Sequence, residues 1–354
     1  MVEIITEKMR CEASLKDSRR SILDSFGYKK ILNDRYSPDE YLFFREGDDL
    51  VPLVAKEGMA TFYGGAQFNH ANFLPENPKL LDTMLKYLVE QDYRFRLLSI
   101  NNDIFSLLDP AFRKYDVPYQ PEWHYEKPEV FRAETFIEQF SVRKIRRSYR
   151  YAFIKKREYR FETIPFGQFV NIFPQIMKKH RNYFRQRGLK SAWEGKEELL
   201  FSILGYFEKN EQSLIRCIYR DDEPAALYTI VYDQKEMLLY FGGSLEKKDH
   251  YISKIWYYDM LEHATTIARK LNIESINALR GNYATKRRFG FTPHPLYALV
   301  RDPQWHIRRD SEISDEEYYR IYGRDFGAET YPHNQNYKTK ANLADSIGKA
   351  VRPK

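Results

Sequence analysis

The sequence has few cysteines and no long apolar run, and each shortage excludes a class of protein. Its two cysteines, Cys11 and Cys217, allow at most one disulfide bond and form no repeated metal-ligand spacing. The N-terminal residues are charged, and no stretch reaches the length of a transmembrane helix. We therefore expect a soluble cytoplasmic protein with no metal site and no stable membrane insertion.

Several common catalytic signatures are also missing. The chain has no Gly-x-x-x-x-Gly-Lys-Ser/Thr loop, no His-Glu-x-x-His, no Gly-x-Ser-x-Gly and no Cys-x-x-Cys. These absences argue against a P-loop nucleotidase, a zinc peptidase, a serine hydrolase of the nucleophile-elbow type and a dithiol redox enzyme. What remains is ordinary globular composition over 354 residues, enough for two domains, with 28 Tyr and 24 Phe.

Basic residues are concentrated in one short segment. Residues 143–160 contain nine basic residues against Glu158, a net charge of +8, so the rest of the chain carries −1 of the total +7. A cluster of this kind attracts phosphates or RNA, and interleaved tyrosines could stack on bases. The alternative is a solvated helix face that pairs with acidic neighbours. The residues predicted to bind phosphate or RNA are Arg143, Lys144, Arg146, Arg147 and Arg150.

One order of segments occurs twice along the chain. Short apolar runs at 41–45, 50–55 and 60–65 are separated by polar turns, and runs at 214–220, 225–232 and 237–243 repeat the arrangement. Aromatic and β-branched runs split by Asp, Gly and Pro predict antiparallel hairpins. Each group is followed by a helical pattern, with Leu81, Met84, Leu85 and Leu88 at i, i+3, i+4 and i+7 in the first copy.

The second copy continues the same helical period from Tyr257 to Leu271, and a further strand follows each helix, at 95–101 and 273–277. Equivalent residues are 175 to 178 positions apart, as with Arg45 and Arg220. Helices are also predicted at 169–189 and 196–207, ahead of the second group of strands. We interpret the pattern as a duplication of a mixed α/β unit.

Three segments of the second half form a set. They are 140–147 (FSVRKIRR), 180–188 (HRNYFRQRG) and 279–291 (LRGNYATKRRFGF). The last is the most specific, because a glycine loop leads to a lysine, further basic residues and then Phe-Gly. Together they resemble the GNAT-superfamily acetyltransferase-like proteins that are related to the Fem-type peptidyltransferases. The resemblance covers 140–300, and the first half joins it through the repeat.

This resemblance implies an α/β fold of tandem GNAT-like domains, each a mixed, mostly antiparallel sheet flanked by helices. The expected divisions are 1–139, a degenerate copy, 140–300, the acyltransferase domain, and 301–354, a polar extension. The implied activity is GNAT-type N-acyl transfer from acyl-CoA to an amine acceptor. A Fem-like transfer of an aminoacyl group from aminoacyl-tRNA is the alternative, and a non-catalytic RNA-binding protein is a second one.

The resemblance implies a role for one residue, and the chemistry of acyl transfer suggests others. The lysine of the closing motif, Lys286, would lie near the reacting carbonyl, where a fixed cation stabilises the developing oxyanion. Tyr283 is a candidate to protonate the leaving group, and His180 and His250 are candidates for proton transfer, although a lone histidine is usually structural. The predicted substrate-binding residues are Gly242, Gly243, Ser253, Arg280, Arg287 and Arg288.

One segment departs from the GNAT pattern and leaves the donor open. GNAT enzymes that bind coenzyme A carry a glycine-rich loop before the long helix, where backbone amides hold the pyrophosphate. Residues 245–253 of this chain contain no glycine and include two acidic residues. The co-substrate is therefore acyl-CoA or aminoacyl-tRNA.

The two copies also differ in charge. Asn277 leads to Lys286, Arg287 and Arg288, whereas the equivalent Asn101 leads to no basic cluster. We therefore expect the reaction centre in the second copy.

Overall fold

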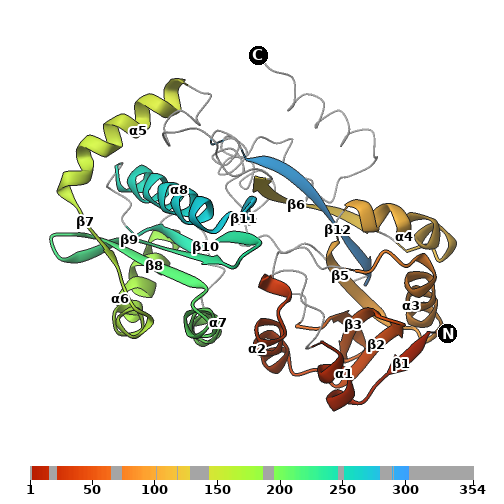
Figure 1. Ribbon diagram of the computed structural model, residues 1–354. Helices are drawn as coiled ribbons and strands as arrows, with labels where there is room; N and C mark the ends of the chain where they lie inside the picture. Colours follow the sequence, from red (N-terminus) through yellow and green to blue (C-terminus); the bar gives the residue numbers. More distant parts are fainter. Residues whose placement is uncertain are drawn as a thin grey trace. The chain divides into compact units, whose positions relative to one another are not determined.

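The computed structural model describes residues 2–15, 22–64, 74–100, 102–117, 119–127, 143–185, 195–245, 251–279, 289 and 291–302. The chain forms two compact units, each with helices against its own sheet (Figure 1). The first contains Met1–His124 together with the last described strand from His294 onward, and the second contains Tyr125–Pro293. No described helix has the length and apolarity needed to span a bilayer.

The first unit has the strand order β1-β2-β3-β4-β5-β12, antiparallel except for the parallel pair β4 and β5. Its strands are β1 (Glu3–Ile5), β2 (Glu40–Glu46), β3 (Asp49–Lys56), β4 (Met59–Phe62), β5 (Arg94–Ile100) and β12 (Thr292–Arg301). Its helices are α1 (Lys8–Leu15), α2 (Phe26–Tyr36), α3 (Pro78–Glu90) and α4 (Asn102–Lys114), with a 3-10 turn at Ile22–Asp24.

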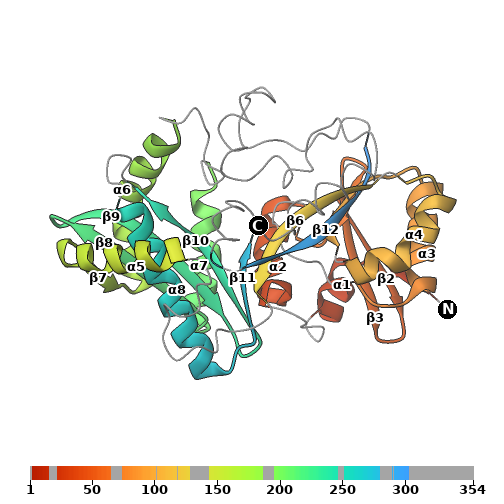
Figure 2. The same ribbon diagram turned by 90° about the horizontal axis from the view of Figure 1, so that it is seen from above.

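Helices cover both faces of this sheet, and β2 accordingly has apolar side chains on both of its sides. Leu42 and Phe44 belong to the core beneath α3 and α4, while Tyr41 and Phe43 pack with Cys11 on the side of α1 (Figure 2). The alternation follows from the two-residue period of a strand. The buried stripe Leu81, Met84, Leu85 and Leu88 of α3 faces this sheet, as its helical spacing predicts, and Asn77 caps the helix by accepting a hydrogen bond from the Leu80 amide at 3.1 Å.

A strand from the C-terminal end of the described chain completes the first sheet. Leu299 of β12 lies opposite Leu97 of β5. Just beyond the strand, the buried carboxylate of Asp302 accepts a hydrogen bond of 2.8 Å from Nε of Arg96. The pairing of residues more than 200 positions apart therefore ties β12 to the first unit.

The second unit has the order β6-β11-β10-β9-β8-β7, antiparallel except for the parallel pair β10 and β11. Its strands are the end of β6 (Tyr119–Lys127), β7 (Arg160–Thr163), β8 (Ser213–Arg220), β9 (Glu223–Tyr232), β10 (Glu236–Ser244) and β11 (Ser275–Leu279). Its helices are α5 (Arg143–Lys155), a 3-10 turn (Lys156–Glu158), α6 (Phe166–Arg185), α7 (Glu197–Lys209) and α8 (Ile252–Leu271).

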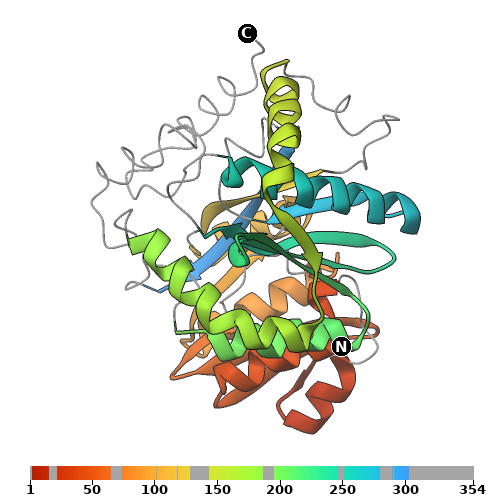
Figure 3. The ribbon, with the colours of Figure 1, turned by 90° about the vertical axis from the view of Figure 1, so that its left-hand side faces the viewer.

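The helices of the second unit lie in two layers. Figure 3 shows α6 and α7 on one face of the sheet, and α8 with α5 on the other. The rings of Phe169, Phe173 and Phe201 join α6 to α7, with centroids of Phe173 and Phe201 4.3 Å apart. The helices predicted at 169–189 and 196–207 are confirmed over their described parts, as α6 and α7, and the helix predicted from the period of 257–271 is confirmed as α8.

The duplication is visible in the order of elements. The series β2, β3, β4, α3 and β5 repeats as β8, β9, β10, α8 and β11. The glycine pairs differ, however. β4 ends at Phe62 and Gly64 lies in a turn with φ of 97°, whereas Gly242 and Gly243 lie inside β10. The strand of the first copy ends before Gly64, so Gly64 and Gly242 have different backbone roles.

Candidate functional site

The two parallel strands of the second unit separate part of the way along their length. β10 and β11 pair from Glu236 and Ser275 to Leu238 and Asn277, and no further. β10 then continues to Ser244 while remaining paired with β9. At the same level the side chain of Asn277 accepts a hydrogen bond of 2.8 Å from the Leu279 amide, and Leu279 has φ of 54°. In the described part of the chain, β10 therefore extends beyond its pairing with β11.

A bulge lies at this separation. The register between β9 and β10 shifts between Leu239 and Phe241, which leaves Tyr240 as the extra residue. The ring of Tyr240 contacts Phe207 of α7, with centroids 6.1 Å apart, and the ring of Phe241 contacts His180 of α6 at 5.8 Å. Two successive side chains therefore point to the same face of the sheet, as a bulge allows.

His180 is the titratable group beside this bulge. Its side chain is buried, with 6% exposed, and burial lowers the pKa of its imidazole to about 4. The ring is therefore neutral at physiological pH. A neutral imidazole can accept a proton from an amine that becomes acidic as it is acylated.

Gly242 is required by the neighbouring strand. A Cβ at this position would lie 2.7 Å from Cβ of Tyr228 and 2.8 Å from the carbonyl oxygen of Leu227, both in β9. A Cβ at Gly243 would meet nothing within 4 Å. The absence of a side chain at Gly242 leaves room for Tyr228, which extends toward α8. Packing therefore explains the glycine at position 242, whereas position 243 has open space around it.

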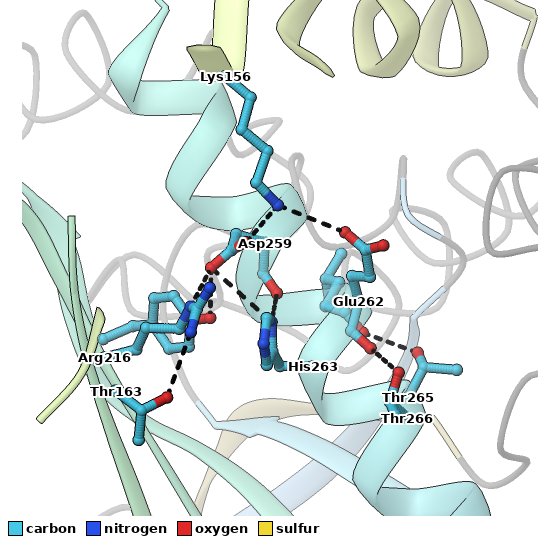
Figure 4. Close-up of polar contacts among 10 residues, drawn as sticks. Lys156, Thr163, Arg216, Asp259, Glu262, His263, Thr265 and Thr266 are labelled. Carbon is cyan, nitrogen blue, oxygen red and sulfur yellow. Dashed lines mark hydrogen bonds and ion pairs between the residues drawn. The ribbon is translucent and has the colours of Figure 1, made fainter. Parts of the chain in front are cut away.

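The hydroxyl of Tyr228 forms a hydrogen bond with a buried carboxylate of α8, that of Asp259. Asp259 is 2% exposed and accepts a hydrogen bond of 2.7 Å from the hydroxyl of Tyr228 at Oδ2. Nε of Arg216, in β8, donates to the same oxygen at 2.7 Å, and Nζ of Lys156 donates to Oδ1 at 2.8 Å (Figure 4). Lys156 follows α5, so one carboxylate joins the α5 segment, the sheet and α8.

Within hydrogen-bonding distance, this cluster has two cations, Lys156 and Arg216, and one anion, Asp259. Burial alone would raise the pKa of Asp259, but hydrogen bonds from Lys156 and Tyr228 and the charges of Lys156 and Arg216 outweigh it, so the pKa lies below its usual value. Two cations share one buried anion, and Glu262 approaches Lys156 only at 3.9 Å. The cluster therefore depends on Asp259 remaining ionised.

A row of rings continues from α5 to the closing motif. Tyr149 of α5 meets Tyr258 of α8 edge-on at 5.2 Å, and Phe289 contacts Tyr258 at 5.4 Å and Tyr257 at 4.8 Å. Phe289, which follows the basic cluster 286–288, thus packs against α8. The helix α5, which carries the other basic cluster, packs against α8 as well. The depression between α5 and α8 lined by Tyr149 is only about 10 Å³, room for one water molecule, which is too small for a substrate.

The outward face of α5 is basic. Arg143, Arg146, Arg147 and Arg150 are all exposed, and their spacing of i, i+3, i+4 and i+7 places them on one side of the helix. None forms an ion pair with any residue that the structure describes. Ile154 lies on the same side with 65% of its surface exposed. We call these five residues the α5 face.

The structure reaches only part of the predicted site. Gly242 and Gly243 lie at the separation of β10 and β11, and Ser253 lies in the first turn of α8, although its side chain and that of Lys144 are not described. The remaining predicted residues lie outside the described part of the chain and stay predictions; they are Arg280, Tyr283, Lys286, Arg287, Arg288 and His250.

Sequence reasoning missed Asp259, Arg216 and Tyr228. The signal for Asp259 was a single acidic residue between Tyr258 and Met260 on the apolar side of a helix. Such a residue is seldom buried without a cationic partner. Among the described residues, no group of three or more His, Cys, Asp or Glu side chains is arranged to hold a metal ion.

Comparison with known proteins identifies the fold. No known family profile matches the sequence, and no curated protein sequence gives a significant match. Solved structures do match. FemX aligns over 85% of this chain and 97% of its own, with a TM-score of 0.57 and 10% identity. The C-terminal domain of a putative lysylphosphatidylglycerol synthetase from Agrobacterium fabrum aligns over 84% and 93%, with a TM-score of 0.53 and 12% identity.

A third match is L-PGS from Bacillus licheniformis, which aligns over 91% of this chain and 97% of its own, with a TM-score of 0.50 and 14% identity. At these identities the likeness concerns the fold. It confirms the α/β architecture expected from the repeat and from the closing motif. The chain thus has a tandem GNAT-like α/β fold, which is similar to the folds of FemX and of these two synthetase structures.

Proposed function

We propose that the second unit transfers an acyl group from an activated donor to an amine, and that the acyl group enters where β10 and β11 separate. The observation that carries the proposal is the end of strand pairing at Leu238 and Asn277 while β10 runs on to Ser244. In this proposal an extended donor aligns along β10 beyond Leu238, where the described part of β11 no longer pairs with it. Ligands of open α/β sheets bind where neighbouring strands diverge at their carboxyl ends.

The reaction asks for few groups. The nitrogen of a neutral amine attacks the acyl carbon, the bond from that carbon to the donor sulfur or oxygen breaks, and the leaving group takes up a proton. Lys286 would stabilise the oxyanion and Tyr283 would supply that proton. Among the described residues, His180 is the candidate to accept the proton of the amine, because its imidazole is neutral and lies beside the bulge of β10, although a pKa of about 4 makes it a weak base.

Acyl-CoA is the donor of the first form of the proposal, and aminoacyl-tRNA is the donor of the second. The segment before α8 favours the second, because residues 245–251 contain no glycine and two acidic side chains. Such a loop offers a pyrophosphate poorer access to backbone amides. The acceptor in either case is an amine-bearing molecule.

Donor binding separates these forms. Purified full-length protein is titrated with acetyl-CoA and, in parallel, with a pool of aminoacylated and deacylated tRNA at low and high salt. Saturable coenzyme A binding that survives high salt supports the first form. A preference for aminoacylated over deacylated tRNA supports the second, whereas equal binding of both without product indicates an RNA-binding protein. Failure to bind either donor removes the proposed activity.

A further inference from the structure

We propose that the α5 face binds the surface of an anionic phospholipid membrane, with Ile154 inserting among the lipids. The proposal does not depend on acyl transfer. Its first basis is charge: four arginines lie along one side of α5, all exposed and none paired with a described acidic residue. Glu158 does not offset them, because it pairs with Lys155 at 2.5 Å.

The second basis is the exposure of Ile154. An isoleucine with 65% of its surface in water contributes little to the core of the unit, and Ile154 lies on the arginine side of the helix, one turn after Arg150. An exposed aliphatic side chain offers nothing to a nucleic acid phosphate, whereas at a bilayer interface it leaves water for the acyl region. Tyr151, which is 49% exposed beside it, is a residue type that membrane interfaces favour.

The opposite side of α5 explains why the face stays outward. Tyr149 and Ala152 are turned toward α8, and Lys156 holds the end of the segment through Asp259. The helix is therefore fixed to the unit by one side and presents the other. Basic residues next to an apolar anchor are the two signals that together hold a peripheral protein on an anionic surface.

Site-specific labelling tests insertion directly. The two natural cysteines are buried, and burial raises the pKa of Cys11 to about 12 and that of Cys217 to about 11, so both are poor nucleophiles. A single Ile154→Cys variant can therefore be labelled with an environment-sensitive dye. Met9→Cys in α1, which is 86% exposed and is not part of the α5 face, is the matched control.

The dye at position 154 is expected to shift to the blue with vesicles of phosphatidylcholine and phosphatidylserine, and to stay unchanged with phosphatidylcholine alone. The dye at position 9 is expected to stay unchanged with both. No shift at position 154, or an equal shift with neutral vesicles, overturns the proposal.

Sedimentation with the same vesicles tests the energetic roles. Ile154→Ser is expected to weaken binding to anionic vesicles by about three- to tenfold. Arg147→Glu is expected to weaken it by more than about fivefold, the effect of losing one cation, because the substitution also adds a negative charge. Lys270→Glu, at the exposed end of α8, is expected to leave binding unchanged. If Arg147→Glu weakens binding of tRNA and Ile154→Ser changes no binding, the face is a nucleic acid surface and the proposal is wrong.

Discussion

Nζ of Lys156 lies 2.8 Å from Oδ1 of Asp259, and this contact fixes the segment that follows the basic helix α5 to the long helix α8. The same carboxylate accepts hydrogen bonds from Arg216 and Tyr228, so residues of three distant segments meet at one buried anion. A buried carboxylate with two cations is strongly coupled to its partners, because loss of the anion leaves Lys156 only the more distant Glu262 and leaves Arg216 no ion pair with another described residue.

Asp259→Asn is expected to lower the free energy of unfolding by about 3 kcal/mol. The amide cannot neutralise Lys156 and Arg216, and its NH2 group cannot accept a hydrogen bond from either. Urea denaturation followed by circular dichroism measures the change. Asp221→Asn is the control, because Asp221 is almost fully exposed and its change should stay within about 0.5 kcal/mol. A loss of similar size in both variants would contradict the assigned role of Asp259.

Lys156→Met is expected to speed amide hydrogen exchange in α5 while lowering overall stability by only about 1.5 kcal/mol, since Asp259 keeps Arg216 and Tyr228. The neighbouring Lys155→Met is the matched control, because Lys155 pairs with the exposed Glu158. Exchange measured by mass spectrometry on peptides from α5 distinguishes the two. Equal exchange in the two variants would show that the contact with Asp259 does not hold the helix.

Gly242→Ala is expected to destabilise the protein by about 1–3 kcal/mol, because the new methyl group would overlap with Tyr228 and the Leu227 carbonyl. Gly243→Ala is the natural comparison, since open space surrounds that position. Thermal unfolding of the two variants should rank Gly242→Ala well below Gly243→Ala. The reverse order would mean that the bulge in β10 is placed incorrectly.

His180 should make the protein sensitive to mild acid. Its pKa is about 4 in the folded chain and near the ordinary value of 6.5 in the unfolded chain, so the unfolded chain binds the proton first as the pH falls. Stability is therefore complete above pH 6.5 and declines as the pH drops toward 4. The loss between about pH 7.5 and about pH 5 should be about 2 kcal/mol larger in the wild type than in His180→Phe. Parallel pH profiles for the two proteins would refute the assignment.

The sequence predicted much of this architecture because its signals are local. The period of Leu81, Met84, Leu85 and Leu88 is a property of one helix, and the spacing of the second copy repeats it in α8. Hairpins such as β8 with β9 were predictable for the same reason, since two residues of a turn, Asp221 and Asp222, join strands that are neighbours in the chain.

The rest depends on contacts between distant residues, which no local pattern encodes. β12 pairs with β5, with Leu299 opposite Leu97, and neither strand contains a sequence signal that predicts this pairing. Lys156 and Arg216 looked like ordinary surface charges in the sequence, because an ion pair is recognisable only when the partner is known. The exposure of Ile154 likewise became visible only once the inward side of α5 was known.

Acyl transfer itself is tested by incubating the full-length protein with labelled acetyl-CoA, and separately with labelled aminoacyl-tRNA, in the presence of a cell extract that supplies amine acceptors. The proposed function predicts that label passes to an amine from one of the two donors. It also predicts that Lys286→Ala slows this transfer by about 10²-fold, the loss typical of one oxyanion contact, while Lys270→Ala retains the wild-type rate. No transfer from either donor, or wild-type turnover by Lys286→Ala, would contradict the proposed reaction centre.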